Sequence, residues 1–296
     1  MKMRFADFHN DTITVASKKG LPLFGSGLNC DLKYAENFSE FFNIFAIFIP
    51  ENLSEKEAYD YYKRNIDYFY KQAEIFDIAV VKNYSDFDRD RDKIRIMLSI
   101  ENFSVASERL IEEAYSDGVR IASLSWNADN SLVGGAEGEG CLTEKGKEII
   151  RFMEKRKIAL DISHLNFESA KEVLSFVGRP IIATHSSSFE KTPHLRNLKT
   201  DDYLSLTGMG GVAGVNFYRE FLGGNEDYKE IAEHIAYYYE TNPEGVVFGS
   251  DFDGAELPDG ISGLSDMRKV YEVIEEKGID PDILYRNAEN FIKRMF

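Results

Sequence analysis

The chain has 296 residues, of which 43% are hydrophobic and 29% charged, and this globular mixture excludes a disordered or collagen-like protein. The formal net charge of −16 argues against nucleic acid as a partner, because such a chain repels a phosphate backbone. The two cysteines, Cys30 and Cys141, indicate neither a disulfide framework nor a cysteine-rich zinc site. No apolar stretch has the length of a signal peptide or a membrane span, so we expect a cytoplasmic protein without membrane contact.

Short apolar runs recur along the chain and predict strands. Eight of them stand out, at residues 4–9, 42–49, 94–100, 119–124, 158–162, 180–184, 211–217 and 245–249. Most are rich in Ile, Val, Leu or Phe, as buried parallel strands are. A further apolar run, residues 78–82, is interpreted either as an extra strand or as part of a loop.

Helix signals lie between these runs. Ser54 and Glu57 fit a capping box that opens a helix reaching Phe76. Asp280 and Pro281 fit the N-cap and first position of a C-terminal helix. Further helices are expected at residues 108–115, 143–156, 166–176, 201–206 and 227–239.

The alternation of eight strands with helices predicts an α/β fold, a (β/α)8 TIM barrel that forms one domain over residues 1–296. The alternative is an open doubly wound sheet. That fold usually has a glycine-rich phosphate loop after its first strand, and residues 5–12 contain none. In a barrel, we expect the active site at the C-terminal ends of the strands.

Metal-binding residue types follow several of these strand ends. His9 and Asp11 are two residues apart, so on a strand they share a face and aim together into the barrel mouth. Glu101 ends the third strand and is costly to bury unless it is paired or bound to a metal. His164 and His185 follow the fifth and sixth strands. Mixed histidine and carboxylate ligands suit catalytic zinc.

The eighth strand is followed by two aspartates that are predicted to share a face. Asp251 is the candidate proton carrier between a water molecule and a leaving group. Asp253 is adequately explained as a turn residue. The two remaining histidines, His194 and His234, are interpreted as a loop residue and a helix-surface residue.

Ligands on strands one, three, five and six, with a proton carrier on strand eight, resemble the pattern of the amidohydrolase superfamily. Within it, the chain is similar to the membrane dipeptidase (renal dipeptidase) family, through short segments that together span nearly the whole sequence. They are residues 7–11, 100–101, 118–120, 161–164, 185–187, 196–197, 214–218 and 249–254.

This resemblance implies two Zn²⁺ ions. His9 and Asp11 would hold one ion, His164 and His185 the other, and Glu101 would bridge both.

The resemblance also implies how a dipeptide binds and reacts. Arg196 would grip its free carboxylate, with Asn197 as a further substrate contact, and Asp251 would carry the proton, alongside Glu101 as a catalytic residue. A homodimer is implied as well.

The chain departs from the family pattern at three places. Trp126 stands where mammalian members have a histidine that contacts the substrate carbonyl, and Asn102-Phe103 stands where Gly-Gly often follows the bridging glutamate. The secretion signal and lipid-anchor tail of the animal enzymes are not found in the sequence. Trp126 either packs against residues 127–140 or lines the pocket, where it would favour an apolar or small substrate residue beside the scissile bond.

The sequence therefore predicts a zinc metallopeptidase, a dipeptidase that uses a metal-bridging hydroxide. One alternative is a metal hydrolase acting on a lactone, a cyclic amide or an N-acyl amino acid, and Trp126 is the residue that keeps it open. Another is a barrel that binds metal and ligand without catalysis, which predicts a missing ligand or proton carrier. Zinc analysis followed by a dipeptide panel separates the three.

Overall fold

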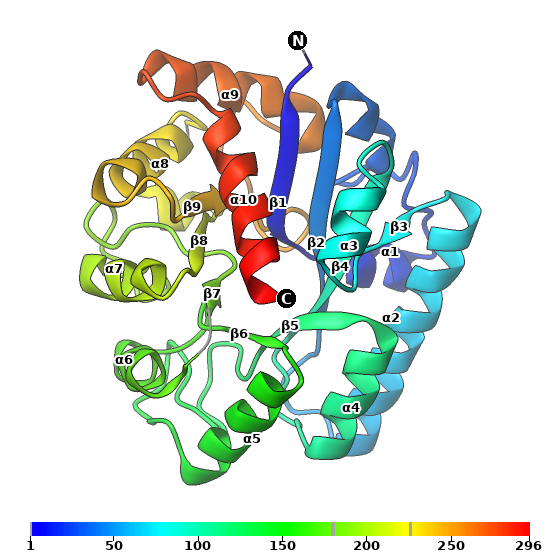
Figure 1. The fold of residues 1–296 in the computed structure, drawn as a ribbon, viewed down its shortest axis with the longest axis vertical. Coiled ribbons are helices and arrows are strands. Elements are labelled where there is room, and N and C mark those ends of the chain that lie inside the picture. Colours follow the sequence, from blue (N-terminus) through cyan, green and yellow to red (C-terminus); the bar gives the residue numbers. More distant parts are fainter. Residues whose placement is uncertain (1, 179–180, 225–226) are drawn as a thin grey trace.

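The computed structural model describes residues 2–178, 181–224 and 227–296. Parallel strands form a closed barrel with helices around it, which confirms the predicted TIM barrel (Figure 1). The barrel strands are β1 Arg4–Asn10, β2 Glu40–Phe48, β4 Ile94–Glu101, β5 Val119–Ser123, β6 Ala159–Asp161, β7 Ile182–Ala183, β8 Val212–Val215 and β9 Val246–Phe248. The ring is closed by the pairing of β2 with β4.

The additional apolar run at residues 78–82 contains a ninth, very short strand. This strand, β3 (Ala79–Val80), pairs with β4 through Ala79 and Arg95 and adds to the barrel without being part of its ring. The predicted strand at residues 180–184 begins outside the described residues, and its described part is β7.

The helices surround the barrel and include all those predicted. They are α1 Thr12–Lys19, α2 Glu55–Ile75, α3 Tyr84–Arg89, α4 Glu108–Asp117, α5 Glu144–Lys155, α6 Phe167–Phe176, α7 Thr200–Gly208, α8 Glu230–Thr241, α9 Met267–Glu276 and α10 Asp282–Met295. The capping box of α2 is present, with the Ser54 N–H donating to Glu57 Oε2 at 2.9 Å. Helices α1, α3 and α9 were not predicted. Short 3₁₀ helices occur at Leu32–Asn37, Arg219–Leu222 and Leu264–Asp266.

Helix α10 closes the end of the barrel at which the strands begin. It lies over the centre of the barrel in Figure 1. Its residues Phe291 and Ile292 belong to the same buried cluster as Phe42, Met97 and Val247 of the strands. A second, larger cluster packs the strands against the outer helices. With one end closed by α10, the opposite end, where the strands finish, carries the functional residues.

A charge network around the buried Arg95 fastens α10 to the strands. Arg95 is fully buried, and its Nη2 donates to the Tyr285 hydroxyl at 2.7 Å and to Glu40 Oε2 at 3.2 Å. The Tyr285 hydroxyl donates in turn to Glu40 at 2.7 Å. Arg4 of β1 holds Asp282 with two hydrogen bonds of 2.8 and 2.6 Å. These contacts pair the buried charge of Arg95 with Glu40, because an unpaired buried charge would be costly.

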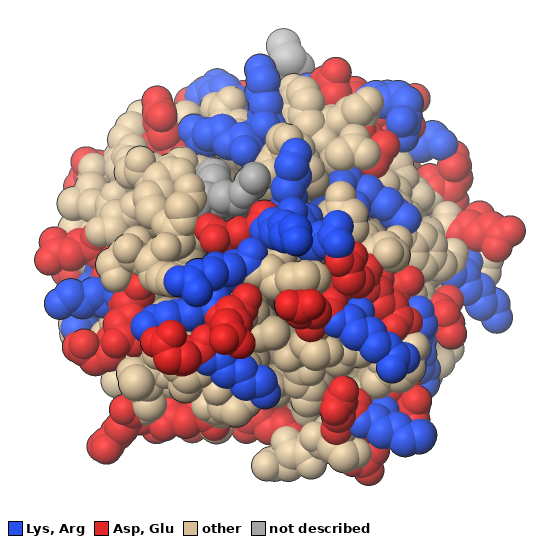
Figure 2. All heavy atoms as spheres, turned by 60° about the horizontal axis from the view of Figure 1, so that its bottom comes forward, with Lys and Arg blue, Asp and Glu red and all other residues tan. Residues whose placement is uncertain are grey.

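The face shown in Figure 2 is mixed in charge. Lysine and arginine side chains lie beside aspartate and glutamate, with broad uncharged areas between them. Within the described ranges, no helix is long and apolar enough to cross a membrane.

Candidate metal centre and substrate pocket

The strand ends bring the five predicted metal ligands together. Glu101, the last residue of β4, lies with Oε1 2.6 Å from His164 Nε2 and with Oε2 3.4 Å from His9 Nε2. His164 Nε2 is 2.8 Å from His185 Nε2, and His9 Nε2 is 3.7 Å from Asp11 Oδ2. All five side chains are buried. The two oxygens of Glu101 thus face different ligand pairs, as a bridging carboxylate requires.

Two pairs of residues, His9 with Asp11 and Asp251 with Asp253, do not share a strand face as predicted, although His9 and Asp11 do converge. Strand β1 ends at Asn10, its pairing with β2 shifts between Asp7 and Asn10, and Asp11 is the N-cap of α1. The bend at this cap, and not a shared strand face, turns Asp11 toward His9. Asp251 and Asp253 follow β9 in a turn, both with positive φ, and their carboxylates bind different partners.

The residue after Glu101 shows why glycine is not needed there. Asn102 has φ 62°, a left-handed conformation that asparagine adopts more readily than most residues. Its side-chain amide donates to Ile49 O at 2.7 Å. Asparagine therefore provides the required backbone turn and also fixes it to the segment after β2.

Hydrogen bonds orient two of the candidate histidine ligands. Thr184 Oγ1 lies 2.8 Å from His185 Nδ1 and donates its own proton to Asp161 Oδ2 at 2.5 Å. Asn127 Oδ1 lies 3.0 Å from His164 Nδ1. An oxygen that accepts from Nδ1–H leaves the Nε2 lone pair free to face a metal.

The protonation states of His185 and Glu101 also fit a cation. Burial, together with the neighbouring His9, lowers the pKa of His185 well below its usual value, so the ring is neutral. Burial alone would raise the pKa of Glu101, but His164 and His9 lower it below the usual value, so the carboxylate is ionised. Burial and the neighbouring Glu101 raise the pKa of Asp11 to about 7. A cation close to Asp11 would favour its ionised form.

Two buried polar atoms in the cluster have no hydrogen-bond partner among the described residues. They are His9 Nε2 and Asp11 Oδ1. Buried polar atoms are rarely left without a partner, and both of these are ordinary zinc ligands. The residues present therefore fit a metal centre.

Asp251 lies beside this centre. Its Oδ2 accepts from Asn216 Nδ2 at 3.0 Å, and its Oδ1 is 3.8 Å from His9 Nε2. The carboxylate of Asp253, in contrast, accepts from Thr12 Oγ1 at 2.6 Å and from the main-chain N–H of Asn29 at 2.7 Å. Asp253 is thus held as a turn residue, as predicted, while Asp251 faces the ligands.

A pocket of about 750 Å³ opens above the ligands. Helix α1, the end of β2 and the loop after β5 contribute an apolar side with Val15, Phe48 and Trp126. The loops after β7 and β8 contribute a polar side that includes Arg196 and Tyr218. This volume is in the range of small-molecule sites.

Arg196 lies at the floor of the pocket. Its Nη2 is 2.9 Å from Nε2 of both His164 and His185, while its buried Nη1 has no partner among the described residues. Burial lowers the pKa of Arg196 to about 10, so the guanidinium remains a cation at neutral pH. A cation with a free N–H beside the ligands is suited to a substrate carboxylate.

Trp126 is part of the pocket wall. Its ring centre lies 5.6 Å from that of Phe48 and 6.3 Å from that of His164, and its exposed fraction is 36%. Of the two interpretations of Trp126, the structure supports the one that places it in the pocket.

Asn197, predicted as a substrate contact, is not among the pocket-lining residues. Its side-chain amide donates to the carbonyls of Ser188, Thr192 and Phe221 at 3.4, 2.9 and 2.9 Å. These bonds tie together the loop that carries Arg196.

The interpretation of His234 as a helix-surface residue was wrong. His234 is fully buried on α8, and its Nδ1 accepts from the Ser188 N–H at 3.0 Å. His194 is a loop residue as predicted, but it also lines the pocket. Its position two residues before Arg196 was the sequence signal that could have indicated this.

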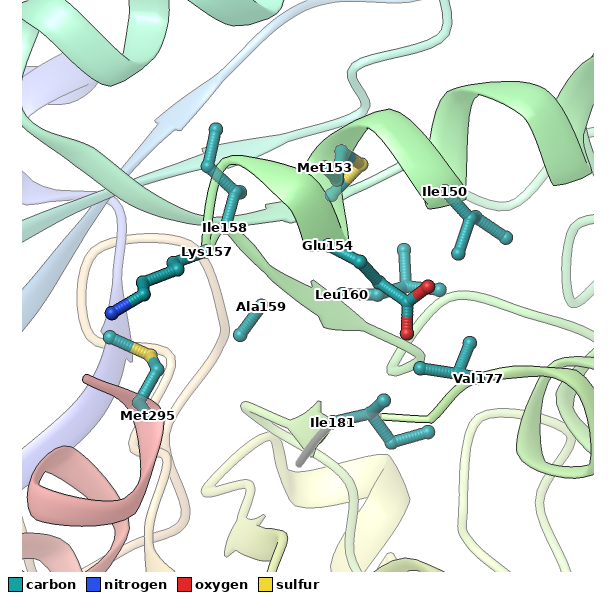
Figure 3. Close-up of a pocket in the computed structure, with 10 residues that line it drawn as sticks. All are labelled: Ile150, Met153, Glu154, Lys157, Ile158, Ala159, Leu160, Val177, Ile181 and Met295. Atoms are coloured by element: carbon teal, nitrogen blue, oxygen red, sulfur yellow. The ribbon is translucent and has the colours of Figure 1, made fainter.

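A second hollow lies between α5, β6 and the end of α10, where Ile150, Leu160 and Val177 surround it (Figure 3). Its volume of about 10 Å³ holds a single water molecule at most. The pocket above the ligands, which Glu101, His164 and Asp251 line, is the candidate substrate site.

An α/β barrel with metal-ligating side chains at the C-terminal ends of its strands has the architecture of the amidohydrolase-type metallohydrolases. The chain belongs to the membrane dipeptidase family (peptidase family M19), whose model matches residues 4–294.

Among curated proteins, an uncharacterized dipeptidase of Schizosaccharomyces pombe is 33% identical over 200 residues, which are 63% of this chain and 47% of the yeast protein. An uncharacterized protein of Klebsiella pneumoniae is 29% identical over 207 residues, 64% of this chain and 76% of that protein. The matched region thus spans about half the length of the yeast relative.

Solved structures share the fold over the whole chain. A metallo peptidase from Rhodobacter sphaeroides, liganded with a phosphinate mimic of the dipeptide L-Ala-D-Ala, has a TM-score of 0.92 at 19% identity, covering 100% of both chains. The probable dipeptidase PvdM from Pseudomonas aeruginosa has a TM-score of 0.81 at 17% identity, covering 96% of this chain and 98% of that one.

Proposed function

We propose that the protein is a zinc-dependent dipeptidase that hydrolyses the peptide bond of dipeptides. The observation that carries the proposal is the position of Glu101 between two ligand pairs, with the buried cation of Arg196 2.9 Å from His164 Nε2. The dipeptide mimic bound to the Rhodobacter sphaeroides relative supports the same substrate class.

Five side chains would hold the two ions. His9 and Asp11 would bind one, His164 and His185 the other, and Glu101 both. When bound, zinc supplies a water molecule of lowered pKa and polarises the scissile carbonyl.

The remaining steps belong to the protein's own side chains. Asp251 takes a proton as the water attacks and returns it to the leaving amine, while Asn216 holds Asp251 Oδ2 in place. Arg196 offers its buried guanidinium to the C-terminal carboxylate of the substrate. Because Arg196 lies at the pocket floor beside the ligands, the carboxylate must be close to the scissile bond, which favours dipeptides over longer peptides.

A second candidate is a metal hydrolase that acts on another small amide or a lactone. The position of Trp126 in the pocket wall favours it, because a large flat ring narrows the site beside His164. Hydrolysis of lactones or cyclic amides, without hydrolysis of any dipeptide, would establish this second function.

Metal analysis and a substrate panel test the proposal. Purified protein should carry up to two zinc equivalents, lose dipeptide hydrolysis on chelation and regain it when zinc is added. Full activity in thoroughly metal-free protein would reject the mechanism.

We also propose that the protein is a homodimer and works in the cytoplasm. Light scattering measures the mass in solution, and fractionation of the source cells locates the protein.

A further inference from the structure

The turn that carries Asp251 is tied to strand β1 by a fully buried aspartate, Asp7. Asp7 Oδ1 accepts from the Ser250 N–H at 2.8 Å, and Asp7 Oδ2 accepts from the Ser250 hydroxyl at 2.5 Å. The Ser250 oxygen accepts in turn from the Phe252 N–H at 3.2 Å. Asp7 therefore fixes the residues on both sides of Asp251.

The Asp251 turn needs such support. Asp251 has φ 60°, in the left-handed region where a residue other than glycine persists only if its surroundings hold it. Its N–H donates to His9 O at 3.0 Å, which places it against β1 beside the candidate ligand. A Cβ atom at Gly254 would lie 2.1 Å from Asp11 Oδ2 and 2.6 Å from Asp251 Oδ1. The turn is thus packed directly against both carboxylates.

The chemistry of Asp7 matches this task. A carboxylate accepts at both oxygens, so it can bind the N–H and the O–H of one serine, whereas an asparagine has only one acceptor oxygen. No lysine or arginine pairs with Asp7 in the described part of the chain, and a buried carboxylate without a cation is expensive. Burial of such a residue costs stability, and its two bonds to Ser250, together with a longer one at 3.5 Å from the His9 N–H to Oδ1, offset that cost.

We propose that Asp7 is a positioning residue of the dipeptidase reaction, which acts through Ser250 to hold the Asp251 carboxylate beside His9. The inference rests on the proposed function. Asp7 would thus contribute to the reaction although its side chain contacts neither the substrate nor a metal.

Two variants and their combination test the proposal. Asp7→Asn and Ser250→Ala should each lower kcat for a dipeptide about 10- to 100-fold, since a small misplacement of a catalytic group has effects of this size. Zinc content and KM should stay within about twofold of the wild type. The double variant should be no slower than the slower single variant, because both changes break the same contact.

Asp31→Asn is the matched control. Asp31 is also a fully buried aspartate, and its carboxylate accepts from the N–H groups of Gly25 and Gly27 at 2.7 and 3.0 Å. This variant should lower the melting temperature while keeping kcat, so it separates lost stability from lost positioning.

Several results would overturn the inference. They are an unchanged kcat in Ser250→Ala, additive losses in the double variant, loss of zinc in either single variant, or an equal loss of kcat in Asp31→Asn. If Asp7→Asn does not fold, Ser250→Ala still decides by its kcat. A wild-type protein without dipeptidase activity would instead reject the proposed function.

Discussion

Asp251 is the residue whose chemistry is most directly testable, because its environment also accommodates asparagine. Asn216 donates to Oδ2, and the left-handed backbone is one that asparagine tolerates well. Asp251→Asn should therefore keep fold and zinc but lower kcat by roughly 10²–10⁴-fold, the usual range for general acid–base catalysis. Turnover and bound zinc are measured on the same sample. Loss of zinc would identify Asp251 as a ligand.

The effect of Arg196→Ala on hydrolysis should depend on whether the substrate has a free C-terminal carboxylate. Loss of hydrogen bonds to a charged group should lower kcat/KM for a free dipeptide by about 10- to 100-fold. A dipeptide amidated at its C-terminus already lacks this contact and should lose little more. Similar losses on both substrates would show that Arg196 supports the structure of the site instead.

Trp126→His should change specificity. Tryptophan gives the wall beside Phe48 a large apolar face and one N–H donor, whereas histidine is smaller and can titrate. The order of preference across a dipeptide panel should shift away from apolar or small residues beside the scissile bond, at constant zinc content. If the order stays the same and the melting temperature falls, Trp126 is a packing residue.

Asn127→Ala should weaken zinc binding. Its Oδ1 orients His164, and loss of such an outer partner commonly lowers metal affinity about 10- to 100-fold. Competition with a chromogenic chelator measures this affinity. Asn130→Ala is the control in the same loop, because the Asn130 amide binds the Leu124 carbonyl at 2.9 Å. Equal weakening in both variants would assign the effect to the loop.

At the scale of elements, α10 closes the end of the barrel opposite the candidate site. A substitution there should therefore lower stability without changing activity. Tyr285→Phe removes the hydroxyl between Arg95 and Glu40 and should cost about 1–3 kcal/mol of unfolding free energy. Urea unfolding measures the cost, and kcat should be unchanged because the site is at the opposite end. A kcat that falls together with stability would show that the two ends are coupled.

The strands were predictable because a barrel strand must be apolar on both sides. The amphipathic α9 could also have been found, since Met267, Val270, Tyr271 and Ile274 repeat at helical spacing. Helices α1 and α3 were harder. Thr12–Lys19 and Tyr84–Arg89 are short, and their apolar residues are too few to show a helical period.

The residues of the candidate site also include some that the sequence could predict and some that it could not. The convergence of the candidate ligands was predictable from residue type at strand ends. The roles of Asn127, Thr184 and Asn216 depend on loop paths and register, which no local pattern shows. The same holds for His234. It was predicted on a helix surface, but it is buried because the distant loop residue Ser188 packs against it.

At the scale of the whole molecule, His234 predicts how stability depends on pH. Burial lowers its pKa to about 4, against about 6.5 in the unfolded chain, so between these values the unfolded state binds more protons. Stability should thus be lost as pH falls through this window, by up to about 1.4 kcal/mol per pH unit. In His234→Gln, whose amide oxygen can still accept from Ser188, urea unfolding at several pH values should show a shallower slope. An unchanged slope would mean that other groups control acid unfolding.

The backbone at Asp251 also bears on how such a protein can evolve. A single-nucleotide change converts an aspartate codon to an asparagine codon, and asparagine adopts this left-handed conformation as readily. If Asp251 carries the proton as proposed, hydrolysis would be lost in one mutational step, while the barrel, the cluster of candidate ligands and the pocket persist. Relatives with asparagine at this position would be expected to retain small peptides and release them uncleaved, serving as carriers or sensors.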